Sequence, residues 1–411
     1  MSIKKLYFIK SHKKTKYNKK QYNKLFIIKI CFIIILILYN IFKFLFNIKF
    51  FFNNIIFIIS YLNKQIEYYN IQKLLLLYNN NKEIIKKYER INIPKISIIS
   101  PIYNSEKYIL RFMKSIRNQN FIDIEIILVD DCSFDNSVSK IEKYAIEDER
   151  IILIKNKRNK GTFVTRNIGV LFSKGKYIIL PDPDDCLSKN MLKAIYSIAE
   201  KSNYEVIRFN SFLTSKREIV YHQFLKKLEN KKVFQPELST YIFYGFNELL
   251  IIDCYLSNKF FRKEVFIKAL NYLPKKYLNM YNIYQEDQLM NYIIYRIAKS
   301  YFFFKKIGYY YIKNFESITS NKLFGKSELI IKCRLLFLNI VYENSKHTKY
   351  EKDMTNHLLS ILIQFSNAKQ MVKNIRQKEI MIYFYNLINK FLECKFINKE
   401  NKYILKTIKN L

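Results

Sequence analysis

The chain has 411 residues and half of them are hydrophobic, which is enough for a catalytic domain with an anchor and an accessory region. It carries 71 Lys and Arg against 34 Asp and Glu, a formal net charge of +37. Such a charge suggests an anionic partner, but Lys is spread along the whole chain and no zinc-finger, helix-turn-helix or RNA-recognition pattern occurs. The composition therefore argues against a nucleic-acid-binding protein, and a nucleotide diphosphate or a lipid phosphate fits the same charge. The six cysteines include no Cys-x-x-Cys pair, which argues against a zinc site or a dense disulfide framework.

The amino-terminal region predicts a membrane anchor. A Lys-rich tail, residues 1–24, precedes an apolar stretch, residues 25–46, whose length is roughly the ~20 residues that span a bilayer. The long basic lead and the missing small-residue cleavage site disfavour a cleaved signal peptide. We therefore expect a single-pass signal anchor. A second apolar run, residues 50–62, is shorter and is either interfacial or a continuation of the first; the topology inverts if it spans.

The side of the membrane that holds the rest of the chain stays open at this stage. The positive-inside rule places the Lys-rich tail in the cytosol and the remainder in the lumen of the Golgi or endoplasmic reticulum. However, the chain contains no Asn-x-Ser/Thr acceptor. Either the catalytic part never meets the glycosylation machinery, or the lineage lacks or avoids it.

The periodicity predicts three further parts after the anchor. Residues 47–94 are expected to form a membrane-proximal stem, which is polar and helix-prone from 63 to 93. Residues 95–322 alternate between short apolar runs and helical patterns. Residues 323–411 have a helical pattern and carry no chemical motif, so we expect an accessory region.

The alternating part predicts an α/β fold. Its order is βαβαβαβ as far as residue 182, which implies a Rossmann-like, mostly parallel sheet with helices on both faces. Beyond residue 188 the order becomes mixed. Strands are expected at 96–101, 124–131, 150–156 and 176–182, and helices at 105–119, 137–148 and 161–175.

Acidic residues gather where two of these predicted strands end. Asp130 and Asp131 close the second strand, and Asp182, Asp184 and Asp185 follow the fourth. Open α/β sheets place ligand-binding groups at the carboxyl ends of parallel strands. Clustered carboxylates in a basic protein suggest that a cation, most simply a divalent metal, lies between them.

The positions of the glycines point to the same region. The chain has six glycines, and Gly161, Gly169 and Gly175 fall within the short segment that leads to Asp182. Because glycine is so rare here, these three are predicted to mark positions that need an unusual backbone or a close approach.

Four segments in order resemble the family 2 glycosyltransferases of the GT-A fold. They are SIISPIYNSEKYI, RNQNFIDIEIILVDDCSFDNS, NKGTFVTRNIGVLFSKGKYIILPDPDD and IYQEDQLM, and the resemblance covers about residues 95–319. Each motif alone is common, but their order and intervals make the signal specific. The resemblance implies an inverting transfer of a sugar from a nucleotide-sugar, most simply a UDP-sugar, to a glycan or glycolipid acceptor.

The resemblance also implies how the donor binds. Tyr103 would cover the nucleotide base, Asp131 would accept a hydrogen bond from the uracil ring nitrogen, and Arg166 would help to hold the nucleotide-sugar. Ordinary packing for the tyrosine, a turn cap for one acid of the Asp130–Asp131 pair and a solvated helix face for the arginine stay open as alternatives. The residues assigned to the donor are Pro101, Tyr103, Asn104, Asp130, Asp131, Arg166 and Asp182.

The same resemblance also implies which residues bind the metal and which residue is the catalytic base. Asp184 and Asp185 would hold Mn²⁺ or Mg²⁺, which neutralises the charge that grows on the diphosphate leaving group. Asp287 would be the base that takes the acceptor proton, with Glu286 orienting the acceptor. Alone, this last pair is only a helix start with acids in its first turn. The aromatic run GYYYIKNFESIT, residues 308–319, lines the acceptor site or packs in the core.

Departures from the family pattern narrow the function. Cys132 stands where Gly is usual, Pro183 lies inside the metal motif, and Gln285 precedes the Glu-Asp pair where Gly is common. The chain has no Trp, so the Gln-x-x-Arg-Trp motif of processive polysaccharide synthases is absent. Two alternatives remain: a dolichyl-phosphate-type transferase on the cytosolic face, and a catalytically inactive membrane protein that binds sugar nucleotides.

Overall fold

The computed structural model describes mainly the part of the chain in which the sequence predicts alternating strands and helices. The chain divides into two units, Met1–Asn70 and Ile71–Leu411, and the described fold belongs to the second. Most of the predicted tail, anchor and accessory region lies outside the described residues. Among those that are described, no helix is both long and apolar enough to cross a membrane. The described residues are 93–215, 255–273 and 286–312, the strands at 82–84, 218–220 and 232–234, and positions 34, 35, 38, 58, 59, 278, 314, 386, 388, 389, 393, 402 and 406.

The first half of the domain has the predicted βαβ order. Its strands lie side by side in the order β4-β3-β2-β5, and all three pairings are parallel. The connecting helices α3, α4 and α5 follow β2, β3 and β4 respectively. The bounds are β2 Ile96–Ile102, α3 Ile109–Arg117, β3 Ile124–Asp130, α4 Ser137–Glu147, β4 Ile151–Asn156, α5 Thr162–Phe172 and β5 Tyr177–Ile179.

The second half corrects the prediction of a mostly parallel sheet, because here the sheet is mixed. Strand β10 pairs antiparallel with both β5 and β7, while β11 pairs parallel with β7 and antiparallel with β6. Hydrophobic periodicity shows that a strand forms but not which way it runs. The bounds are β6 Cys186–Leu187, α6 Met191–Ser202, β7 Val206–Leu213, β10 Lys259–Arg262, α10 Lys263–Tyr272, α12 Glu286–Ile297 and β11 Ser300–Tyr311.

Three short strands complete the described sheet. Strand β8 (Glu218–Val220) pairs with β7, and β9 (Lys232–Phe234) pairs with β11. Strand β1 (Lys82–Ile84) pairs antiparallel with β4. Because β1 lies within the segment predicted as a stem, part of that segment joins the edge of the sheet.

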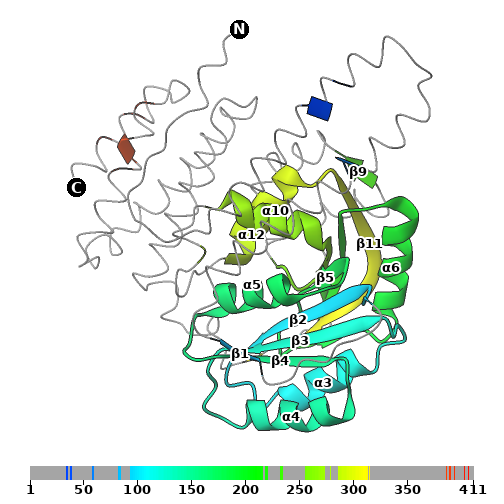
Figure 1. Cartoon of the computed structure of the whole chain (residues 1–411), viewed down its shortest axis with the longest axis vertical. Coiled ribbons are helices and arrows are strands. Elements are labelled where there is room, and N and C mark those ends of the chain that lie inside the picture. The colour runs from blue at the N-terminus through cyan, green and yellow to red at the C-terminus, as the bar shows by residue number, and fades with distance from the viewer. Residues whose placement is uncertain are drawn as a thin grey trace. The chain divides into compact units, whose positions relative to one another are not determined.

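Helices cover both faces of the sheet, as predicted. Helices α3 and α4 lie on one side of the central strands and α5 on the other (Figure 1). The first face packs alternate strand residues such as Ile98 and Leu128 against Phe112 of α3 and Ile195 of α6. Helices α10 and α12 contact each other, and α10 also contacts α5. Every residue of β2 and β3 is buried, which explains their continuous apolar runs.

The three glycines are where the backbone needs them. A Cβ on Gly169 of α5 would overlap Ile99 Cγ2 on β2, and one on Gly175 would lie 2.7 Å from the backbone nitrogen of Ser97. Gly161, which precedes α5, has φ +82°, in the region that favours glycine. Helix α5 can therefore lie directly on the sheet, and this position fixes where its polar residues point.

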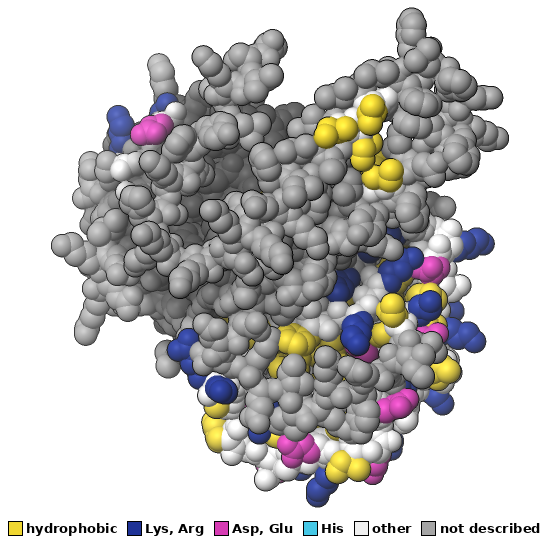
Figure 2. Space-filling model, viewed as in Figure 1, with side chains coloured by type: hydrophobic (Ala, Val, Ile, Leu, Met, Phe, Trp, Pro, Cys, Tyr) yellow, Lys and Arg dark blue, Asp and Glu magenta, His cyan; other side chains and the backbone are white. Residues whose placement is uncertain are grey.

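Charge on the visible surface is mixed. On the face shown in Figure 2, the described Lys and Arg side chains are interspersed with acidic and apolar ones. This distribution agrees with the even spread of Lys along the sequence.

We expect Gly169→Ala to lower the free energy of unfolding by about 1–3 kcal/mol, because the added methyl group overpacks the contact between α5 and β2. Urea denaturation of the purified chain measures the change. Thr162→Ala, on an exposed position of the same helix, is the control and should stay within about 0.5 kcal/mol of the parent. Equal effects of the two substitutions would contradict the close approach.

Candidate active site

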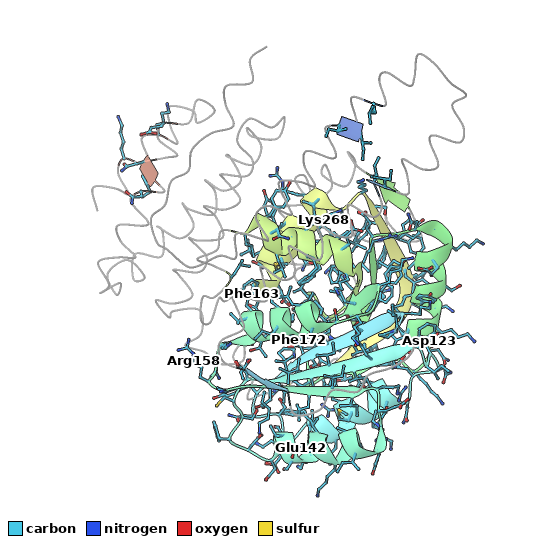
Figure 3. All side chains as sticks on the ribbon, in the orientation of Figure 1. Asp123, Glu142, Arg158, Phe163, Phe172 and Lys268 are labelled. Carbon is cyan, nitrogen blue, oxygen red and sulfur yellow. The ribbon has the colours of Figure 1, made fainter. Side chains whose placement is uncertain are left out.

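The predicted site residues follow the carboxyl ends of the parallel strands. Asp123, just before β3, and Arg158, just after β4, lie at opposite edges of the sheet in Figure 3. The carboxyl ends are therefore on the Arg158 side. The acidic motifs after β3 and β5 belong to this edge.

The loops after β2 and β3 hold each other in place. Asn104 has φ +45°, and its backbone N–H donates to Ser133 Oγ at 3.0 Å. In return its Oδ1 accepts from the Phe134 backbone N–H at 3.1 Å. Tyr103 is 48% exposed and meets Phe134 edge-to-face, with ring centroids 6.2 Å apart. Asn104 thus joins two loops, and the exposed aromatic pair stands at their tip.

Pro101 lies within strand β2. It occupies the position of β2 opposite Val129 of β3. The pairing of β2 with β5 ends at Ile98, so the missing N–H of the proline breaks no ladder on that side.

Asp130 and Asp131 are both buried and have different partners. Asp130 accepts from the Ser133 backbone N–H at 3.3 Å, and burial raises its pKa. Asp131 accepts from Asn156 Nδ2 at 2.9 Å and from the backbone N–H groups of Lys160 and Gly161 at 2.8 Å each. Asp130 therefore stabilises the turn after β3, and Asp131 fixes the loop that leads into α5.

The residue after this pair explains a departure from the family pattern. Cys132 is exposed and has φ +67°, a conformation that glycine adopts without strain. The usual Gly at this position therefore has a backbone reason, and Cys132 tolerates the conformation without any described disulfide partner.

Arg166 lies between the two acidic motifs. It belongs to α5, and its side chain is only 4% exposed. One terminal nitrogen donates to Asp182 Oδ1 at 3.0 Å; the other lies 2.9 Å from Asp287 Oδ1 and 3.4 Å from Glu286 Oε1. The sequence predicts a residue that holds the nucleotide-sugar or a solvated helix face, and the structure shows a buried bridge between carboxylates.

The charges in this cluster do not balance, since three carboxylates surround one guanidinium. Burial alone would lower the pKa of Arg166, but Asp287, Asp182 and Glu286 raise it well above its ordinary value. Burial and the neighbouring negative charges raise the pKa of both Asp182 and Glu286 above the usual carboxyl range. The cluster therefore retains a cationic arginine and takes up protons more readily than free carboxylates would.

Asp185 is tied to β11 by both of its oxygens. Its Oδ2 accepts from the Tyr309 hydroxyl at 2.6 Å and its Oδ1 from the Ile312 backbone N–H at 2.8 Å. The same hydroxyl accepts from the Asp182 backbone N–H at 3.2 Å. Burial raises the pKa of Asp185 well above its ordinary value. This geometry ties Asp185 to the end of β11 and the residue that follows it, and its role as a metal ligand stays a prediction.

Asp184 is more open than its neighbour. Its Oδ2 accepts from Asn314 Nδ2 at 3.1 Å, and its backbone carbonyl accepts from Arg111 at 2.7 Å. Asn314 in turn accepts from the Tyr108 hydroxyl at 2.8 Å. Arg111 of α3 and Asn314, which follows β11, therefore support the acidic loop.

The base candidate has a fixed orientation. Besides Arg166 at Oδ1, Asp287 accepts at Oδ2 from the Leu256 backbone N–H at 3.2 Å. The adjacent Tyr255 and Tyr311 approach each other, with ring centroids 6.3 Å apart. Burial raises the pKa of Tyr311 to about 12, and Asp185 adds to this effect.

Sequence reasoning missed several supporting residues. The aromatic run indicated Tyr309, Tyr311 and Asn314 only as a group, and nothing in the sequence assigned Tyr108 or Leu256 to the site. Their contacts join positions up to 206 residues apart. In the part of the chain that the structure describes, no three His, Cys, Asp or Glu side chains are arranged to hold a metal ion together.

Comparison with known proteins adds evidence on the family of the domain. Residues 97–270 match the family model described as glycosyl transferase family 2. This match supports glycosyltransferase family 2 for the domain. The matched segment contains the loops after β2, β3 and β5 together with Arg166, and it ends before Glu286.

Curated relatives agree with this family over part of their length. Glycosyltransferase GlyG of Streptococcus pneumoniae is 33% identical over 117 residues, 28% of this chain and 39% of the relative. Cholesterol galactosyltransferase of Borreliella burgdorferi is 33% identical over 126 residues, 31% of this chain and 33% of the relative. The first curated relatives are thus matched over no more than half of their own length.

A solved structure supports the fold. The crystal structure of Staphylococcus aureus TarS 1–349 in complex with UDP-GlcNAc aligns with a TM-score of 0.55 and 19% identity. The alignment covers 77% of this chain and 88% of the TarS chain. At this identity the likeness concerns the fold.

We expect Arg166→Gln to lower the free energy of unfolding by about 3 kcal/mol or more at pH 8, because it leaves buried carboxylates without their cation. The remaining acids would then have pKa values further above those of the unfolded chain. The loss should therefore grow as the pH rises above about 4.5 and be smaller at pH 5.

Denaturant unfolding at several pH values measures this dependence. Arg158→Gln, on an exposed position, is the matched control and should change stability little. An Arg166→Gln loss that is no larger than that of Arg158→Gln, or that shrinks with rising pH, would overturn the bridging role.

Proposed function

We propose that this chain is an inverting glycosyltransferase of the GT-A type, which transfers a sugar from a UDP-sugar to a glycan or glycolipid acceptor. The observation that carries the proposal is the buried Arg166, which holds Asp182 and the Glu286–Asp287 pair together at the carboxyl edge of the sheet. That TarS adopts a similar fold and was solved with UDP and with UDP-GlcNAc supports a uridine nucleotide donor.

Inversion needs a base on the face of the sugar opposite the leaving group. Asp287 is assigned this role, since Arg166 and the Leu256 backbone N–H fix both of its oxygens. A carboxylate oxygen has two lone pairs, so each oxygen keeps one that can accept from the acceptor hydroxyl. The acceptor oxygen bonds to the anomeric carbon, the bond to the diphosphate breaks, and UDP leaves with the electron pair. The proton passes to Asp287.

Glu286 is assigned to orient the acceptor. Burial and the adjacent Asp287 raise its pKa, which favours its protonated form. A protonated carboxyl donates one hydrogen bond and still accepts others. Glu286 can therefore hold a second hydroxyl of the acceptor while Asp287 takes the proton.

The residues assigned to the donor keep that assignment, although not all of them would contact the donor directly. Tyr103 is exposed at the tip of the β2 loop and offers a ring face for the base, whereas Asp130 and Asp131 are buried. Asp131 has one oxygen, Oδ2, that accepts a single described hydrogen bond and so retains capacity for the uracil ring nitrogen. Arg166 acts through Asp182 rather than by direct contact.

The residues present fit Mn²⁺ or Mg²⁺ through Asp184. Magnesium is often held by one or two carboxylates together with substrate phosphates and water. Asp184 is partly exposed and its Oδ1 accepts no hydrogen bond from a described residue, whereas both oxygens of Asp185 are engaged. When bound, the ion supplies positive charge for the leaving diphosphate.

We also propose a membrane location. Residues 25–46 form the single-pass anchor, with the Lys-rich tail in the cytosol and the domain on the far side, in the Golgi or endoplasmic reticulum. The apolar length and the basic lead support this arrangement. Protease protection in microsomes tests the side on which the domain lies.

Asp287→Asn should abolish transfer while donor binding survives, because the amide keeps the shape but cannot take the proton. We expect a fall of roughly 10²–10⁴-fold in UDP release from the donor that a UDP-sugar panel identifies. UDP with Mn²⁺ should still raise the melting temperature. Asp123→Asn, at the opposite edge of the sheet, is the control and should leave turnover unchanged. Undiminished transfer in Asp287→Asn would remove the base assignment.

Adjacent alanine substitutions separate the metal ligand from the structural acid. Asp184→Ala should leave the melting temperature of the ligand-free chain nearly unchanged but remove the stabilisation by UDP with Mn²⁺. Asp185→Ala should lower the free energy of unfolding by about 2 kcal/mol, because it leaves buried donors on Tyr309 and Ile312 unpaired. The Asp185 variant should keep the metal-dependent response. The reverse pattern in thermal-shift assays would assign the metal to Asp185.

A further inference from the structure

Two tyrosines from distant parts of the chain form a pair beside the acids. Tyr255 precedes β10 and is 45% exposed, and Tyr311 is the last residue of β11 and partly exposed. Their ring centroids are 6.3 Å apart and the rings are inclined by 42°. The pair therefore has ring surface available to a ligand.

The backbone fixes this pair between the two acidic motifs. The residue after Tyr255, Leu256, donates its N–H to Asp287 at 3.2 Å. The residue after Tyr311, Ile312, donates its N–H to Asp185 at 2.8 Å. Each tyrosine therefore directly precedes a residue whose backbone N–H donates a hydrogen bond to an acid of the site. The backbone therefore links the pair both to the proposed base and to the loop proposed to hold the diphosphate.

Strand geometry explains why Tyr311 faces the acids. Successive side chains of a strand point to opposite faces, so Tyr309 and Tyr311 share one face and Tyr310 has the other. Tyr309 reaches Asp185 with its hydroxyl, whereas Tyr310 contacts Phe212 with ring centroids 6.1 Å apart. Asp185, Asp184 and Asp182 all act electrostatically on the Tyr311 hydroxyl. Tyr310 is therefore a matched control from the same strand.

We propose that Tyr255 and Tyr311 form a platform that binds a pyranose ring of the acceptor, so that the acceptor is a saccharide. The inference rests on the proposed function and names its substrate class. One face of a pyranose presents C–H groups, which pack on the electron-rich face of an aromatic ring, while its hydroxyls remain free for the polar groups around it. Because the residue next to Tyr255 contacts Asp287, a sugar on this platform is placed near the proposed base.

The test uses the full chain in detergent and disaccharides as probes. Binding of chitobiose, lactose and cellobiose is followed by saturation-transfer NMR in the presence of UDP and Mn²⁺, and transfer is followed with the donor from the UDP-sugar panel. Ribitol 5-phosphate and cholesterol serve as non-saccharide acceptors. The variants are Tyr255→Leu, Tyr311→Leu, the ring-retaining Tyr255→Phe and Tyr311→Phe, and the control Tyr310→Leu.

We expect at least one disaccharide to bind and to accept sugar. Each Leu variant on the platform should raise the acceptor KM at least about tenfold. The donor KM and the slow hydrolysis of the donor by water should not change. The Phe variants and Tyr310→Leu should behave like the parent chain. Melting temperatures check folding; if Tyr311→Leu fails to fold, the half-exposed Tyr255 decides the result.

Three results would overturn the platform. These are acceptor KM values that change less than twofold in Tyr255→Leu, an equal effect of Tyr310→Leu, or transfer to ribitol phosphate or cholesterol with none to a saccharide. Failure of the proposed function looks different, since the parent chain would then hydrolyse no donor. In that case, disaccharide binding that Tyr255→Leu removes would still support the platform, and its absence would overturn it.

Discussion

The ion pairs of Arg166 are the interaction on which the site depends. This guanidinium is buried on α5 and joins Asp182, which follows β5, to Glu286 and Asp287. These two acids begin α12, 120 and 121 residues after Arg166. Buried charges are tolerated where partners compensate them, so removing the arginine exposes the whole cluster to repulsion. Its position requires α5 to lie close against β2, and Gly169 permits that approach. A packing constraint in the core is thus connected to the placement of Asp287, the proposed base.

The acids at this edge divide into those that hold the structure and those that are available for chemistry. Asp131 and Asp185 use their oxygens to fix a loop and the end of β11, respectively. Asp184 and Asp287 are partly exposed at the same edge, whereas Asp131 and Asp185 are buried. Neighbouring acids in one motif therefore have different roles, because burial decides which carboxylates must be satisfied by protein donors.

Much of the fold could be predicted, and so could the identity of the acidic motifs. The elements from β2 to β5 agree closely with the expected ranges, because buried parallel strands have continuous apolar runs and amphipathic helices have a clear period. The direction of β10 could not be predicted, since hydrophobic periodicity is the same whether a strand runs parallel or antiparallel to its neighbours. Nor could the different contacts of Asp184 and Asp185, since those of Asp185 depend on Tyr309 and Ile312, more than a hundred residues away.

By itself the sequence determined the α/β order, the clustering of acids at strand ends and the three glycines. These features depend on hydrophobic periodicity and backbone conformation, which residues close together in the sequence determine. It also determined the apolar amino-terminal stretch and its basic lead. The tertiary structure decided that Arg166 is a buried bridge, that Asp185 is tied to β11 and that Tyr255 meets Tyr311 beside the acids. These contacts join segments far apart in the chain, and their geometry exists only once the sheet has brought those segments to one edge.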